Sequence, residues 1–302
     1  MKLRNTVFCL LLLAGFSASC IREDLSDCYS TNTLQLSYKG DGETEIFGDK
    51  ICRVEMYVFD SENQCVANGV LPQEQVDARI ARLPELRAGT YRIVCLGNTH
   101  HTQVADVASC DFSRITFADG DYLAGESVSG NDSLYYATTA FTVEPFTGKN
   151  DDKTQVVEFA SSHYDVAVEV AGIPGTEQRT AAAALPTLEI CGVSPCTDFE
   201  NRACGEATDY LLETQYDGGS RMLTARTNIM RHTDHANVNV CLRSPDGGTL
   251  LAEVNLAEFL AANPEVDCSR NEVLIPIRME FVSGKVVVTV PEWYVEDVKP
   301  EF

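Results

Sequence analysis

The stretch that decides the fold class runs from Asn271 to Val290 and reads NEVLIPIRMEFVSGKVVVTV. Both arms are rich in β-branched residues, which favour extended strands, and Ser283-Gly284-Lys285 between them is typical of a tight turn. The stretch therefore predicts a β-hairpin. Pro276 cannot donate a backbone hydrogen bond, so it indicates that the first arm lies at a sheet edge or at a bulge.

The second arm of this hairpin is apolar on both faces. Val286, Val288 and Val290 alternate onto one face, and Val287 lies on the other. Such a strand is either covered on both sides or has a face that awaits a partner. Two interpretations stay open: a central strand of a sandwich, or, together with Trp293 in the following tail, a contact surface for another protein.

Working outward, most of the chain repeats the two-residue period of a half-buried strand. In Val54–Asp60, for example, Val54, Met56 and Val58 alternate with polar or aromatic neighbours, and turn signals recur about every 8–12 residues. The only convincing helix covers Leu256 to Ala262, and it stops before a proline. Residues 99–132 and 194–220 lack the pattern and are expected to be loops. The prediction is an all-β protein with two tandem β-sandwich domains.

The polar stretch from Phe146 to Lys153 is the best candidate for a domain boundary, because it is poor in apolar residues and contains glycine. We therefore expect a signal peptide over residues 1–19, an N-terminal sandwich over 20–148 and a C-terminal sandwich over 149–302.

The N-terminus has the features of an export signal. Two basic residues precede the apolar run Val7–Phe16, which leads through Ser17-Ala18-Ser19 to Cys20. A signal that ends on a cysteine is typical of a bacterial lipoprotein, so Cys20 is the expected lipidation site. Ser17 replaces the usual leucine, and an ordinary secretory signal remains the alternative. Acidic Glu23-Asp24 resembles the tags of outer-membrane, surface-exposed lipoproteins.

Charge restricts the partners. The formal net charge of −22 repels phosphate backbones and anionic lipid, which argues against nucleic acid and against a polybasic contact with the membrane. The lipid on Cys20 must therefore hold the protein to the membrane.

Beyond Cys20, the mature chain has ten cysteines. An exported chain permits disulfides, while several of these residues alternate with apolar neighbours in probable strands, where cysteine serves as a small buried residue. Both explanations stay open for the set: Cys28, Cys52, Cys65, Cys95, Cys110, Cys191, Cys196, Cys204, Cys241 and Cys268.

No catalytic constellation is visible. His232 and His235 are too few for a metal site, which needs three or four ligands. The acidic turns Asp119-Gly120-Asp121 and Asn150–Asp152 lack the loop pattern of a dedicated calcium site. There is no phosphate loop, dinucleotide fingerprint or nucleophile elbow. We expect no enzyme, no metal and no cofactor.

Several segments together carry a family resemblance. They are Cys20–Cys28, Val54–Asp60, Ala88–Asn98, Ser133–Tyr136 and the C-terminal hairpin that leads into Trp293. In this order they resemble the FimB-like fimbrial anchor subunits, the minor lipoproteins of type V pili. One departure is Cys95-Leu96, where a tryptophan would be expected.

The resemblance implies two transthyretin-like sandwiches. It also implies a lipoprotein that anchors a fimbrium to the outer membrane, limits its length, and contacts the fimbrillin subunits of the shaft by strand addition. A tip or surface adhesin that binds glycan or a host protein is the alternative, and an envelope enzyme is a third, poorly supported class.

Overall fold

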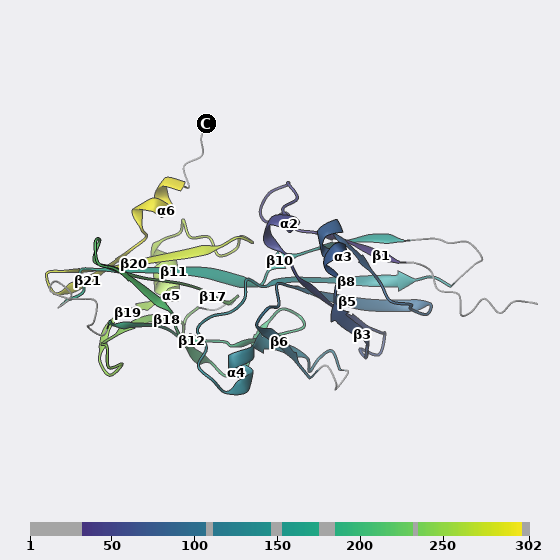
Figure 1. The fold of residues 1–302 in the computed structure, drawn as a ribbon, viewed down its shortest axis with the longest axis horizontal. Coiled ribbons are helices and arrows are strands. Elements are labelled where there is room, and N and C mark those ends of the chain that lie inside the picture. Colours follow the sequence, from purple (N-terminus) through teal and green to yellow (C-terminus); the bar gives the residue numbers. More distant parts are fainter. Residues whose placement is uncertain (1–31, 107–110, 146–152, 175–184, 232–234, 298–302) are drawn as a thin grey trace, which may run out of the picture.

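The computed structural model describes residues 32–106, 111–145, 153–174, 185–231 and 235–297. It is elongated, with two β-rich domains arranged end to end along its long axis (Figure 1). The predicted all-β architecture of two tandem sandwiches is confirmed. No helix in the described ranges is long and apolar enough to cross a membrane.

The N-terminal domain is built around a five-stranded antiparallel sheet with the order β10-β8-β5-β2-β3. Its central strands are long and pair without interruption, β5 with β8 over nine residue pairs. The strands are β2 (Val54–Phe59), β3 (Cys65–Val70), β5 (Gly89–Gly97), β8 (Tyr135–Val143) and β10 (Ala160–Ser161).

Both faces of this sheet are buried, which explains why its strands are apolar on both sides. Val54, Met56 and Val58 of β2 face one core, which is closed by the sheet β4-β1-β9. Tyr57 and Phe59, which alternate with these residues along β2, face a second core. The first covering layer comprises β1 (Thr33–Ser37), β4 (Ile80–Arg82) and β9 (Thr154–Glu158), with α2 (Phe47–Lys50) and α3 (Gln73–Ala78) beside it.

The second covering layer is a small sheet with the order β14-β13-β7-β6. It comprises β6 (Thr102–Ala105), β7 (Thr116–Asp119), β13 (Cys196–Asp198) and β14 (Ala203–Cys204), and α4 (Gly120–Ala124) follows β7. β13 and β14 come from the C-terminal half of the sequence and pair onto β7 of the N-terminal half. We call residues 196–204 the clasp, because they join the two domains. The predicted loops over 99–132 and 194–220 thus contain short strands, and that prediction was wrong.

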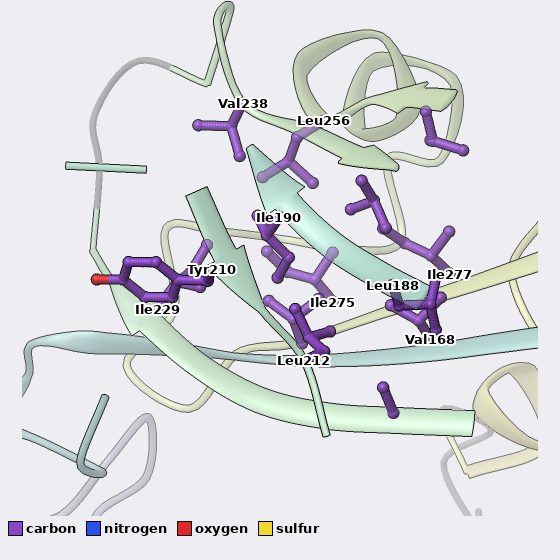
Figure 2. Packing of buried hydrophobic residues seen from close by; sticks show 14 of the residues in the cluster. Val168, Leu188, Ile190, Tyr210, Leu212, Ile229, Val238, Leu256, Ile275 and Ile277 are labelled. Carbon is purple, nitrogen blue, oxygen red and sulfur yellow. The ribbon is translucent and has the colours of Figure 1, made fainter. Parts of the chain in front are cut away.

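The C-terminal domain is a sandwich of the sheets β16-β17-β11-β20-β21 and β15-β12-β18-β19. Figure 2 shows Val168, Ile275 and Ile277 of the first sheet packed against Leu188 and Ile190 of the second. The elements are β11 (His163–Ala171), β12 (Thr187–Val193), β15 (Thr208–Leu211), β16 (Thr214–Asp217), β17 (Met222–Met230), β18 (Asn239–Arg243), β19 (Leu250–Asn255), α5 (Leu256–Ala262), β20 (Leu274–Val282), β21 (Lys285–Thr289) and α6 (Glu292–Asp297).

The hairpin that the sequence predicted most strongly is present. β20 and β21 pair in antiparallel register, with Ser283 and Gly284 at positive φ in the turn. β21 is the outermost strand of its sheet, so the interpretation as a central strand is wrong. Pro276 pairs only with β11, because β21 reaches no further than Arg278; this part of β20 is a local edge, as the proline indicated.

The predicted domain boundary cannot be followed directly, because residues 146–152 lie outside the described residues. The next two strands, β9 and β10, pair with β1 and β8 of the N-terminal domain. On this pairing we propose that the change of domain comes between Ser161, the last residue of β10, and His163, the first residue of β11.

Candidate functional site

The four predicted contact residues follow one another in the chain but do not share one surface: Val286 and Val288 lie on the edge strand β21, Val290 follows it, and Trp293 on α6 reaches across to β11. Val288 opposes the buried Met279, and Val286 opposes the half-buried Phe281, so these valines share the inner face. Val286 and Val290 pack against the core, whereas Val288 stays 36% exposed. Val287 points to the outer face and is 47% exposed.

Trp293 lies on the outer face of the sheet and does not fill the core. Its Nε1 donates a hydrogen bond of 2.8 Å to Oε1 of Glu169 on β11, and the indole is 40% exposed. Arg278 on β20 contacts the other oxygen of Glu169 at 3.3 Å. The next residue, Tyr294, is the one that packs against the core.

These features make β21 a surface suited to strand pairing. Among the described strands, β21 pairs with β20 alone. Edge strands of stable proteins are commonly protected by charges or proline, but β21 carries a single charge, Lys285, before three valines. An extended segment of another chain can therefore add to it through main-chain hydrogen bonds.

A second concentration of polar groups lies where the domains meet, and the sequence analysis did not find it. Glu272, just before β20, accepts hydrogen bonds from Tyr38 and, at 3.2 Å, from Tyr135 of the N-terminal domain. Lys50 forms an ion pair of 2.6 Å with its other oxygen. Lys50, Tyr135 and Glu272 border a polar cavity of about 400 Å³. Glu272 thus ties the C-terminal hairpin to the N-terminal domain.

The electrostatics of this cluster follow from burial and charge. Burial of Glu272 opposes its ionisation, but hydrogen bonds from Lys50 and Tyr38 outweigh that effect and lower its pKa. Burial, then the hydrogen bond to Glu272, raises the pKa of Tyr38. The cluster is therefore ionised at Glu272 and neutral at Tyr38 near neutral pH.

One predicted acidic turn lies at this junction with a histidine beside it. Nδ1 of His101 is 3.4 Å from Asp119 Oδ2, and its Nε2 is 3.6 Å from Asp121 Oδ1. Asp119 also caps α4 through the backbone N–H of Asp121. Burial raises the pKa of Asp119. The three candidate ligand atoms lie within 4.8 Å of one another, but the helix cap and the contacts of His101 with both carboxylates already account for these groups.

The remaining sequence candidates fall in different places. Cys20, His232 and Asn150–Asp152 lie outside the described residues. Cys95 and Cys241 are buried as small core residues, whereas Cys52 is exposed. The thiols of Cys196 and Cys204 are 2.9 Å apart, and those of Cys191 and Cys241 are 3.4 Å apart.

Residues 25–299 match the sequence model of a family described as fimbrillin-A associated anchor proteins Mfa1 and Mfa2. No curated protein matches the sequence.

Solved structures share the fold at low sequence identity. A candidate adhesin from Bacteroides ovatus has a TM-score of 0.70 and 15% identity, covering 88% of this chain and 95% of its own. The fimbrial anchor protein Mfa2 from Porphyromonas gingivalis has a TM-score of 0.69 and 15% identity, covering 87% of this chain and 96% of its own. A candidate polysaccharide-binding protein from Bacteroides thetaiotaomicron has a TM-score of 0.64 and 13% identity, covering 87% of this chain and 99% of its own.

Proposed function

Since the chain belongs to the family of fimbrillin-A associated anchor proteins, we propose that it is a lipoprotein that anchors a fimbrium to the outer membrane and limits its length. The match over residues 25–299 is the observation that carries the proposal. Its direct partners are then the fimbrillin subunits of the shaft.

Attachment to the membrane is assigned to Cys20. It follows the basic and apolar segments of the signal directly, and acyl chains on a cysteine contribute about 0.8 kcal/mol per buried methylene. The strongly acidic chain has no cationic surface excess to replace that contribution.

Attachment to the shaft is assigned to β21. Its outer edge, which no other described strand occupies, and the exposed Val287 and Val288 form a border that an extended segment of a shaft subunit can join, with Trp293 on the outer face of the same sheet. Because the N-terminus is held by lipid, a subunit in this position can end the shaft at its base but cannot be followed by another, so growth stops there.

The alternative role, a tip or surface adhesin, has less support. Sugar-binding faces commonly present exposed aromatic rings. Among the described residues, Trp293 is the one aromatic side chain in the set of exposed large hydrophobic residues, and it is hydrogen-bonded to Glu169.

Replacement of Cys20 tests the anchoring proposal. In Cys20→Ala the acyl chains are lost, so the protein should move from the membrane fraction to the soluble fraction and fimbriae should be shed into the medium. Cys9→Ala, a change of the same type inside the signal, is the matched control and should leave both in the membrane fraction. A Cys20→Ala protein that stays in the membrane fraction would contradict the proposal.

A further inference from the structure

The clasp joins the two domains, and the residue at its turn, Phe199, is buried among aromatic rings of the N-terminal domain. Residues 196–204 leave the C-terminal domain after β12, pair with β7, and return to β15. Phe199 at the turn is fully buried. Its ring contacts, edge-on, the rings of Tyr57, Phe59 and Phe112 of the N-terminal domain at centroid distances of 5.1–6.1 Å. Tyr136 also donates a hydrogen bond of 2.7 Å to the backbone oxygen of Phe199.

Two cysteines close the base of this clasp. Cys196 on β13 and Cys204 on β14 are directly opposite in the antiparallel register, and their sulfur atoms are 2.9 Å apart. Directly opposite residues have Cα atoms about 4.5–5.5 Å apart, inside the range of about 4.4–6.8 Å that a disulfide spans. The backbone therefore already has the separation that a disulfide requires.

The second close pair of thiols, Cys191 and Cys241, lacks this backbone separation. Cys191 on β12 is opposite Asn239 of β18, and Cys241 is opposite Glu189, so the two cysteines are diagonal neighbours. Diagonal neighbours have Cα atoms about 7–8 Å apart, beyond the usual range of a disulfide. Their sulfur atoms, at 3.4 Å, are also further apart than those of the clasp.

We infer that Cys196 and Cys204 form a disulfide that closes the clasp, and that Cys191 and Cys241 remain thiols. The two clasp thiols lose two electrons and two protons as the S–S bond forms. The oxidant is a disulfide of a thiol–disulfide exchange protein in the cell envelope, which is reduced to two thiols. The inference rests on the export that is part of the proposed function, because disulfides persist in oxidising compartments.

The surroundings indicate when the bond forms. Burial, then the neighbouring Cys204, raises the pKa of Cys196 to about 12. The thiolate is the attacking species in disulfide exchange, so a folded, reduced clasp reacts slowly. Oxidation during folding, before Phe199 enters the aromatic core, would avoid this slow step.

This disulfide has a mechanical consequence for an anchor. The lipid is attached before the N-terminal domain, and the edge strand β21 belongs to the C-terminal domain, so tension on a fimbrium passes through the domain junction. A closed clasp keeps the Phe199 side chain in the aromatic core of the N-terminal domain while tension acts on the junction. Because the disulfide lies at this junction, it would strengthen the connection between the domains and not only the fold of one domain.

Peptide mapping of the full-length protein recovered from cell envelopes tests the inference. Free thiols are first alkylated and the digest is analysed without reduction. We expect a linked peptide pair containing Cys196 and Cys204, with alkylated Cys191 and Cys241. Alkylated Cys196 and Cys204, or a disulfide that joins either of them to another cysteine, would overturn the inference.

Thermal unfolding gives a second readout. A reductant should lower the midpoint of the wild-type protein by about 5 °C, as expected for opening a nine-residue loop in a chain of this size. Cys196→Ala/Cys204→Ala should not respond to reductant, whereas the matched variant Cys191→Ala/Cys241→Ala should respond as the wild type does. An equal response in both double variants would also overturn the inference.

The two proposals fail in different ways. Protein that fractionates with the outer membrane but carries free clasp thiols leaves the anchoring proposal standing and refutes the disulfide. Protein that never leaves the cytoplasm refutes the anchoring proposal and removes the compartment that the disulfide needs.

Discussion

Replacing Phe199 by alanine should destabilise the domain junction more than any exposed substitution. Phe199 is fully buried, so truncation removes the transfer free energy of the ring and leaves a cavity. Buried Phe→Ala substitutions cost about 3–5 kcal/mol, and each lost edge-to-face ring contact contributes about 0.5–1.5 kcal/mol within that total. Tyr57, Phe59 and Phe112 would each lose an edge-on contact with the ring of Phe199, so we expect about 4 kcal/mol.

Thermal unfolding and limited proteolysis measure this effect. A loss of about 4 kcal/mol corresponds to a decrease of roughly 7 °C in the midpoint for a chain of this size. Trypsin should cut faster after Arg202, which lies in the turn of the clasp, because the clasp opens more often. The hydrogen bond from Tyr136 is made to the backbone of residue 199, so it survives the substitution.

Leu250→Ala is the control for this experiment. Leu250 is 45% exposed on the edge strand β19, and substitutions at such positions usually change stability by less than about 0.5 kcal/mol. If Phe199→Ala and Leu250→Ala unfold at the same temperature and are cut at the same rate, the clasp does not hold the domains together, and the reasoning is refuted.

Two further predictions concern the edge strand and the domain junction. Val287→Lys places a charge beside the free edge of β21 and should cause fimbriae to be shed from a stably folded protein, whereas Val66→Lys on edge strand β3, at the same 47% exposure, should not. Normal fimbrial retention by Val287→Lys would exclude β21 as the contact. Glu272→Gln should cost about 1–2 kcal/mol at pH 7, measured by urea unfolding, because it removes the charge partner of Lys50. The folded protein lowers the pKa of Glu272, so the stabilisation by its carboxylate is present above the unfolded pKa and is lost as pH falls through the folded pKa. The stabilities of wild type and Glu272→Gln should therefore converge in acid. A constant difference between them down to pH 3 would contradict the assignment.

The sequence by itself determined the local elements of this protein. The alternation in Val54–Phe59, the hairpin around Ser283-Gly284 and the helix Leu256–Ala262 are encoded by residues a few positions apart, and the structure has all three. Asn255 even provides the cap of that helix, accepting a hydrogen bond from the backbone N–H of Glu258. Such features depend on short-range steric preferences and on the period of apolar residues, both of which can be read from a single stretch of sequence.

Only the tertiary structure decided how these elements share their surfaces. The valines of β21 fit a central strand as well as an edge strand, and the choice depends on whether any other strand occupies its free side. The clasp reads as a loop because β13 and β14 are only three and two residues long, and Phe199 becomes a core residue only when the N-terminal sheet offers its aromatic face. Glu272 meets Tyr38 across 234 residues of sequence. Contacts of this kind are selected by burial and charge over the whole chain, because no local pattern specifies which distant surface remains to be covered.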